Sequence, residues 1–155
     1  MAYNSYGNNG GYNSRPNYGG HPQPGRPYRP PEETKPLPLP DDYVDQAERV
    51  MQIYCKKITT SKIRNLLSLV SDIYNVENLR TERELLPESV TALTMMRIRT
   101  VYEAGREGDV KSFVLDAKLL EYIKGIGTDR EALIRFAHYM EALVAYHRFL
   151  GGKEG

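Results

Sequence analysis

The sequence predicts an all-α protein, a compact bundle of about five helices preceded by a disordered N-terminal tail. After position 41, apolar residues recur at intervals of three and four, which is the period of an amphipathic helix, and no stretch alternates as a half-buried strand does. Capping residues, glycines and a proline separate these stretches. Residues 1–40 contain nine of the ten prolines and no Ile, Val, Phe or Trp. The predicted organisation is therefore a tail over 1–40 and a helical domain over 41–153.

The tail is rich in Pro, Gly, Tyr and Asn and poor in side chains that a core could bury. Six of the 13 glycines and five of the 12 tyrosines lie in it. Such a segment buries too little apolar surface to offset the entropy of ordering the chain, so we expect it to be disordered. Its arginines, interleaved with tyrosines, could stack on single-stranded nucleic acid, although a solubilising tail is the simpler interpretation.

A first helix is predicted to begin at Asp41 or Asp42, because an aspartate there can accept hydrogen bonds from the free amides of the first turn. Its apolar residues keep the helical period as far as the pair Lys56 and Lys57: Val44, Ala47, Val50, Met51 and Tyr54. The stretch that follows, residues 56–69, combines four cations and no acid with a helix start and an apolar stripe.

The second helix is predicted over about 60–74, with Thr60 or Ser61 as its cap. Its apolar stripe is Ile63, Leu66, Leu67, Val70 and Tyr74. The first turn of a helix carries partial positive charge, and three lysines lie within a turn of this one: Lys56, Lys57 and Lys62. An anion such as a phosphate would be stabilised there. A capped surface helix with solvated lysines is the alternative interpretation.

Residues 75–86 are charged and lack a period, so we expect a loop. Pro87 suits the first turn of a third helix, since its missing amide hydrogen would have no partner there, and the helix should stop near Gly105. Apolar residues cover most of its circumference, which predicts a central, largely buried helix. Arg97 lies within the apolar stripe and therefore needs a partner, either a carboxylate of this fold or a phosphate from outside. Arg99 lies on the polar line.

Two more helices complete the prediction. Asp109 can cap a fourth helix, which ends at the glycines near position 125. Thr128 and Glu131 form a capping box, T-x-x-E, that opens a fifth helix reaching about Leu150. The C-terminal half of this last helix is apolar on two sides, so one side can serve the core and the other a partner subunit.

Composition and charge narrow the function classes. The formal net charge of +1 excludes a uniformly basic protein that coats nucleic acid, so any nucleic-acid contact must come from a local patch. The single cysteine, Cys55, cannot form an internal disulfide, which favours a reducing compartment. No apolar run is long enough to span a membrane, and the N-terminus lacks the apolar core of a signal peptide. We therefore expect a soluble, cytoplasmic protein with no membrane contact.

No pattern of residues indicates catalysis, a metal or a cofactor. His138 and His147 are nine residues apart, which places them on roughly opposite sides of a helix, and Cys55 has no second thiol. Gly125 and Gly127 lack the following Lys-Ser/Thr of a phosphate-binding P-loop. We expect a binding protein that is not an enzyme.

Three segments, in order, resemble the small subunit of the type III-A CRISPR effector, the Csm complex: ITTSKIRNLLSLV (58–70), VYEAGRE (101–107) and FAHYMEALVAYHRF (136–149). The resemblance covers 41–153 and excludes the tail. It implies a non-catalytic helical protein of antiviral defence that stacks in several copies along a duplex of guide RNA and target RNA. The implied partners are both RNAs, the repeated backbone subunit, the large polymerase-like subunit and further copies of the chain.

The resemblance implies contacts with phosphates and sugars, so that base pairing with the guide supplies the sequence specificity. On the matching segments, the RNA-binding residues that it implies are Lys56, Lys57, Thr60, Lys62, Arg64, Arg97 and Arg99. Lys62 and Arg64 lie about 160° apart around a helix, so they cannot both face one ligand squarely.

Two other function classes stay open at this point. A stand-alone helical adaptor or helix-turn-helix DNA-binding protein would need base-reading side chains on an exposed helix face, and the second helix offers only Asn65 among Ser61, Ser68 and Asp72. A small nuclease subunit would need a cluster of carboxylates or histidines, and the sequence lacks one. The copy number and the state of the isolated protein are also open.

Overall fold

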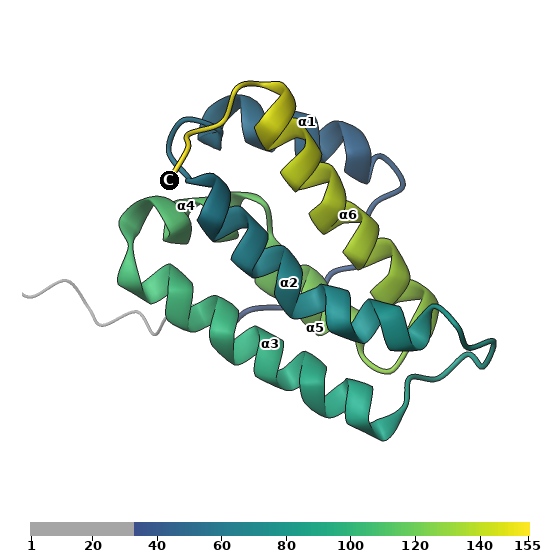
Figure 1. Ribbon diagram of the computed structural model, residues 1–155. Helices are drawn as coiled ribbons and strands as arrows, with labels where there is room; N and C mark the ends of the chain where they lie inside the picture. Colours follow the sequence, from purple (N-terminus) through teal and green to yellow (C-terminus); the bar gives the residue numbers. More distant parts are fainter. Residues whose placement is uncertain (1–32) are drawn as a thin grey trace, which may run out of the picture. The chain divides into compact units, whose positions relative to one another are not determined.

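The computed structural model describes residues 33–155, and all of its regular elements are helices (Figure 1). There are six: α1 (Tyr43–Tyr54), α2 (Thr60–Glu77), α3 (Pro87–Arg106), α4 (Gly108–Asp116), α5 (Leu119–Ile126) and α6 (Arg130–Phe149). Within 33–155 there is no strand, and β-type pairing is limited to two isolated bridges. The predicted all-α bundle is confirmed. None of these six helices is long and apolar enough to cross a bilayer.

The bundle is organised around α2, which runs between α3 and α6 and antiparallel to both (Figure 1). The first residue of α2, Thr60, donates its backbone amide to the Lys153 carbonyl beyond the end of α6, at 2.8 Å. At the other end of α2, the Glu77 carbonyl accepts from Arg130 of α6, at 3.1 Å. Helix α1 covers α6, where the Tyr43 and Tyr139 rings pack edge to face. The largest buried side chains belong to this core: Tyr139, Phe113, Phe136, Met51, Ile58 and Ile63.

The predicted fourth helix is two helices. It breaks after α4 because Lys118 adopts a left-handed conformation, with φ of +56°, which no α-helix continues through. The carbonyl of Ala117, freed at the break, accepts a hydrogen bond from the Tyr139 hydroxyl at 2.9 Å. The prediction missed the break because Leu120 and Ile123 follow Ala117 at intervals of three, whereas the residues that α5 buries, such as Leu119 and Tyr122, are out of phase with the buried residues of α4.

Two predicted caps are displaced by one residue. Thr59, and not Thr60 or Ser61, caps α2, with its hydroxyl oxygen accepting from an amide of the first turn at 3.3 Å. Asp129 caps α6, with its carboxylate accepting from an amide at 3.1 Å, so the capping box predicted from Thr128 does not form. A hydroxyl and a carboxylate one position apart are both good caps, and the backbone conformation selects between them.

The prediction of a central, buried third helix is wrong. Helix α3 begins at Pro87 as predicted, but it lies at an edge of the bundle (Figure 1). It buries one narrow stripe: Ser89, Leu93, Met96, Thr100 and Ala104. Four apolar side chains on its other side are more than half exposed: Met95 at 53%, Ile98 at 52%, Val101 at 52% and Tyr102 at 58%. The sequence showed that α3 is apolar nearly all round, but not which neighbours would cover it.

Residues 33–40 form an extended segment that packs on α5 and α6, so the prediction of disorder is wrong for this part of the tail. The Leu37 amide donates to the Glu121 carbonyl at 3.0 Å, and Arg135 donates to the Leu39 carbonyl at 3.1 Å. Gly125 allows this approach, since a Cβ there would lie 2.0 Å from the Leu37 carbonyl oxygen. The rest of the predicted tail, 1–32, lies outside the described residues.

The second apolar side of α6, predicted from Ala142, Ala145, Tyr146 and Phe149, is partly used within the chain. Ala142 and Tyr146 pack against the core as partly buried residues, whereas Ala145 is exposed. Phe149 is 80% exposed and stacks edge to face on Tyr146, with the ring centroids 6.4 Å apart. Ala145 and Phe149 are therefore the part of this side that stays open to a partner, and its use in a subunit contact stays a prediction.

Candidate functional site

The start of α2 lies against the chain's own C-terminal segment, residues 151–155. The Lys153 carbonyl accepts from both the amide (2.8 Å) and the hydroxyl (3.3 Å) of Thr60. The Ser61 hydroxyl donates to the Gly155 carbonyl. Because acceptors within the chain already bind these donors, the start of α2 does not present them as a free cradle for a phosphate.

A buried histidine fixes the C-terminal segment in place. His147 is 1% exposed, and its Nε2 lies 2.7 Å from the Ile58 carbonyl oxygen. The backbone of Gly152 then passes so close that a Cβ there would lie 2.2 Å from the His147 ring. Sequence reasoning missed this segment, although the glycine pair at 151–152, directly after the last helix, is a signal for a defined helix end.

The three lysines at this end of the molecule differ in how their charges are balanced. Lys62 forms an ion pair with Glu107, at the end of α3. Lys56 donates to a carbonyl of the C-terminal segment, which leaves its charge unbalanced. Lys57 is exposed, with Nζ 5.5 Å from the centre of the Tyr54 ring. Within 33–155 neither Lys56 nor Lys57 has an ion-pair partner.

The predicted arginines lie at three separate places. Arg64 is exposed on α2, about 160° around the helix from Lys62. Arg99 is exposed on α3, and Arg97, two residues earlier, lies on the opposite flank of the same helix. None of these arginines forms an ion pair with a carboxylate of the described residues. The seven predicted residues therefore do not converge on one ligand.

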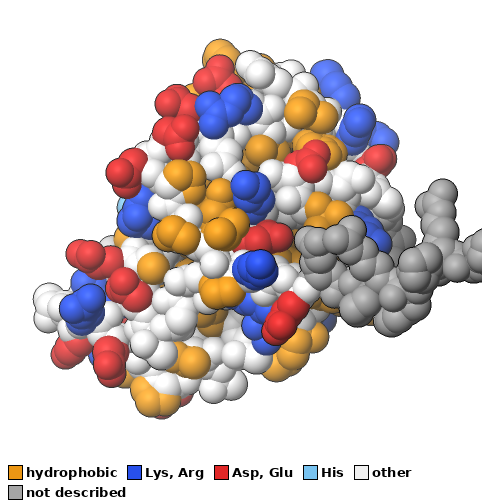
Figure 2. All heavy atoms as spheres, turned by 180° about the vertical axis from the view of Figure 1, so that it is seen from behind, with side chains coloured by type: hydrophobic (Ala, Val, Ile, Leu, Met, Phe, Trp, Pro, Cys, Tyr) orange, Lys and Arg blue, Asp and Glu red, His pale blue; other side chains and the backbone are white. Residues whose placement is uncertain are grey.

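Basic side chains are also dispersed on the back of the molecule. Figure 2 shows Lys and Arg interspersed with acidic and hydrophobic side chains over the described part of this face. The described part of this face is therefore not a continuous basic surface of the kind that attracts nucleic acid. On the described part of this face, contact with a polyanion would depend on single, locally placed cations.

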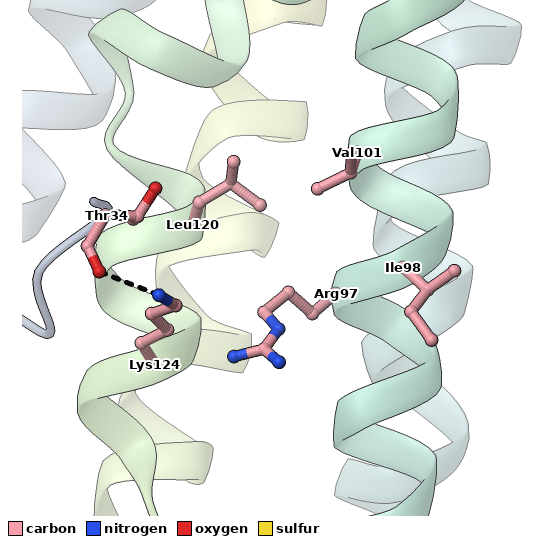
Figure 3. Close-up of a pocket in the computed structure, with 6 residues that line it drawn as sticks. All are labelled: Thr34, Arg97, Ile98, Val101, Leu120 and Lys124. Carbon is pink, nitrogen blue, oxygen red and sulfur yellow. Dashed lines mark hydrogen bonds between the residues drawn. The ribbon is translucent and has the colours of Figure 1, made fainter. Parts of the chain in front are cut away.

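Arg97 lies in a groove between α3 and α5 (Figure 3). The groove has a volume of about 360 Å³, and its apolar walls are Ile98, Val101 and Leu120. The Arg97 guanidinium extends from α3 toward Lys124 on α5, and Lys124 donates to the Thr34 carbonyl at 2.7 Å (Figure 3). A neighbouring cavity of about 130 Å³ is also lined by Arg97 and Lys124.

Sequence reasoning did not single out Lys124. Its spacing in the sequence could have indicated its position, because Lys124 follows Leu120 by four residues and Ile123 by one and so lies beside the apolar stripe of α5. Lys124 matters to the groove because α3 places Arg97 opposite Lys124. Only the packing of the two helices shows that two cations share this groove.

The most buried acid among residues 33–155, Glu77, has a structural role. Glu77 is fully buried at the end of α2 and accepts from Arg80 at 2.6 Å and from the Leu86 amide at 2.8 Å. Burial alone would raise the pKa of Glu77, but hydrogen bonds from Ser89, Leu86 and Arg80 together lower it. The carboxylate therefore stays charged and holds the loop that joins α2 to α3.

The domain also matches known proteins along most of its length. A family model described as Csm2 Type III-A matches residues 39–153. The "CRISPR system Cms protein Csm2" of Mycobacterium tuberculosis (strain CDC 1551 / Oshkosh) is 42% identical over 121 residues, which cover 75% of this chain and 97% of that protein. The protein of the same name from Streptococcus thermophilus is 43% identical over 120 residues, which cover 74% of this chain and 95% of that protein.

Proposed function

The chain belongs to the Csm2 family of type III-A CRISPR systems, and from this membership we propose that it is a non-catalytic subunit of a Csm complex that contacts RNA backbones. Its proposed partners are the guide RNA, the target RNA, the repeated backbone subunit, the large polymerase-like subunit and further copies of itself. Its proposed role is in antiviral defence in the cytoplasm.

The observation that carries the RNA contact is a set of three exposed cations: Lys57, Arg64 and Arg99. They come from the turn before α2, from α2 itself and from the neighbouring α3. Within 33–155 none of them has a carboxylate partner, so a phosphate can bind each one without breaking an internal ion pair. Such contacts neutralise phosphates without reading bases, which suits a subunit of a complex in which guide pairing supplies specificity.

We assign a supporting role to the other predicted residues at the start of α2. Thr60 holds the C-terminal segment, and Lys62 would have to give up Glu107 to bind a phosphate. Lys56 adds positive charge close to Lys57 while its ammonium group donates to a carbonyl. These residues tie the start of α2 to the C-terminal segment and to the end of α3, and in this proposal the exposed cations make the RNA contacts.

The test is RNA binding by the assembled complex with the triple substitution Lys57→Ala, Arg64→Ala and Arg99→Ala. We expect weaker binding at every salt concentration, and a plot of log affinity against log salt that is shallower by about 0.9 for each lost phosphate contact. The affinity should fall equally for unrelated target sequences, because backbone contacts do not read bases. Filter binding over a salt series measures both quantities.

A matched control removes three other exposed cations, Lys35, Arg83 and Arg148. This variant has the same net charge as the test variant but should keep nearly the parental slope. If both triple variants gave the same affinity and the same slope, Lys57, Arg64 and Arg99 would not be the RNA contacts.

A further inference from the structure

The outer face of α3 exposes four large apolar side chains side by side: Met95, Ile98, Val101 and Tyr102. At 100° per residue they span about 120° of the helix circumference, opposite the buried stripe. Scattered single apolar residues are normal on a protein surface, but a contiguous group usually marks an interaction site.

This apolar face continues into the groove that contains Arg97. Ile98 and Val101 belong to both, since they line the groove between α3 and α5 (Figure 3). A third cavity, of about 220 Å³, continues from Val101 toward α4, where Leu115 is 51% exposed. The apolar surface is therefore hollowed, and side chains of a partner could enter it.

Among the described residues, the charges that line the groove are of one sign. Arg97 and Lys124 line both of its cavities, and no carboxylate from 33–155 lines either one. Glu121, three residues before Lys124, forms no ion pair with it, and its buried Oε2 has no hydrogen-bond partner in the described part of the chain. Lys124 donates to the Thr34 carbonyl, a neutral acceptor, and it has no ion-pair partner within 33–155. Partly buried cations of this kind favour an occupant that brings a negative charge.

We propose that this surface, the α3–α5 face, binds a segment of a neighbouring protein subunit that carries apolar side chains and at least one carboxylate. The α3–α5 face consists of Met95, Arg97, Ile98, Val101, Tyr102 and Lys124. The apolar residues bury the partner's apolar side chains, and the two cations bind its carboxylate. The proposal relies on the proposed function only for the presence of neighbouring subunits.

The apolar walls favour protein over RNA as the occupant. An RNA backbone would satisfy Arg97 and Lys124, but it would leave Met95, Ile98 and Val101 without apolar contacts. A protein segment with a carboxylate beside apolar residues complements both the charge and the apolar area, which is the usual composition of a subunit interface.

The first test reverses both charges, with Arg97→Glu and Lys124→Glu in the full chain co-expressed with the other subunits. We expect the amount of this chain that co-purifies with a tagged backbone subunit to fall about tenfold or more, because a carboxylate would then face carboxylates across a desolvated contact. The control, Arg83→Glu with Arg148→Glu, has the same change in charge on exposed residues and should co-purify normally. Circular dichroism melting checks that both variants fold.

The second test identifies the occupant directly. A photo-crosslinking amino acid, p-benzoylphenylalanine, replaces Ile98 in the assembled complex and, as the control, the similarly exposed Ile53 of α1. We expect the Ile98 probe to link to one peptide of another protein subunit that contains Asp or Glu. A crosslink to RNA, a crosslink to a second copy of this chain, or the same products from both positions would overturn the proposal.

The two proposals fail in different ways. If the chain binds no RNA, the Lys57, Arg64 and Arg99 variant keeps the parental RNA affinity while the Ile98 crosslink still forms. If the α3–α5 face is not a subunit contact, the Arg97 and Lys124 variant co-purifies normally whatever the RNA affinity is.

Discussion

At the scale of single residues, Glu77 shows how one buried carboxylate can stabilise a long connection. Its oxygens accept from Arg80 and from the Leu86 amide, so the two ends of the loop between α2 and α3 are held to one group. A buried carboxylate is stable only when its charge is paired and hydrogen-bonded, and here both conditions are met.

Replacing Glu77 with Gln should lower the free energy of unfolding by roughly 1–3 kcal/mol at neutral pH, because the charged hydrogen bonds are lost. The folded-state pKa of Glu77 is lowered, so its stabilisation is complete above the unfolded pKa of about 4.3 and is lost as the pH falls through the lower folded value. The difference between parent and variant should therefore shrink in acid. Urea unfolding at pH 7 and at about pH 3 measures it.

Glu141→Gln is the control, because Glu141 is exposed on α6. It should change stability by less than about 0.5 kcal/mol at both pH values. A difference for Glu77→Gln that stayed constant between the two pH values would contradict the assigned charge state.

The sequence predicted the positions of the candidate cations but not their partners. The cluster at 56–62 was visible as a charge run at a helix start, yet the pairing of Lys62 with Glu107 depends on α3 returning to that end of the bundle. Likewise, the Arg97 groove depends on Lys124, which a different helix supplies. Residue types and local spacing are encoded locally, whereas the partner of a charge is set by packing.

At the scale of elements, the segment 33–40 depends on Gly125 of α5. The Leu37 carbonyl oxygen occupies the space where a Cβ of residue 125 would lie, so only glycine allows the two backbones to approach. Prolines at 36, 38 and 40 suggested an unfolded tail, and no local pattern indicates that α5 offers a surface on which this segment can pack.

Replacing Gly125 with Ala should displace this segment while α1–α6 keep their packing. We expect the Leu37 amide, which donates to the Glu121 carbonyl, to lose its protection from hydrogen exchange by about tenfold or more. Gly105→Ala is the matched control, since a Cβ there meets nothing within 4 Å and the position is helical. The control should keep Leu37 protected and gain about 0.5–1 kcal/mol of stability. Unchanged exchange at Leu37 in Gly125→Ala would contradict the contact.

At the scale of the whole molecule, the helical class and most of the helices could be predicted because the apolar period is strong in each of them. The break at Lys118 could not, because lysine is not one of the residue types, such as Gly or Asn, that usually mark a left-handed position. The exposure of the outer face of α3 could not be predicted either. A helix that is apolar on all sides is predicted to be buried, whether the surface that covers it belongs to the same chain or to another. We propose that this face contacts a neighbouring subunit of the assembly.

The central claim is that this protein works as one subunit of a ribonucleoprotein, and native mass spectrometry of the particle purified through a tag on this chain tests it most directly. The extracted nucleic acid is sized in the same experiment. The predicted result is a multi-subunit particle that contains several copies of this chain and an RNA of guide length. A bare monomer or dimer under gentle salt, with no RNA and no other subunit, would contradict the claim and favour a stand-alone helical adaptor.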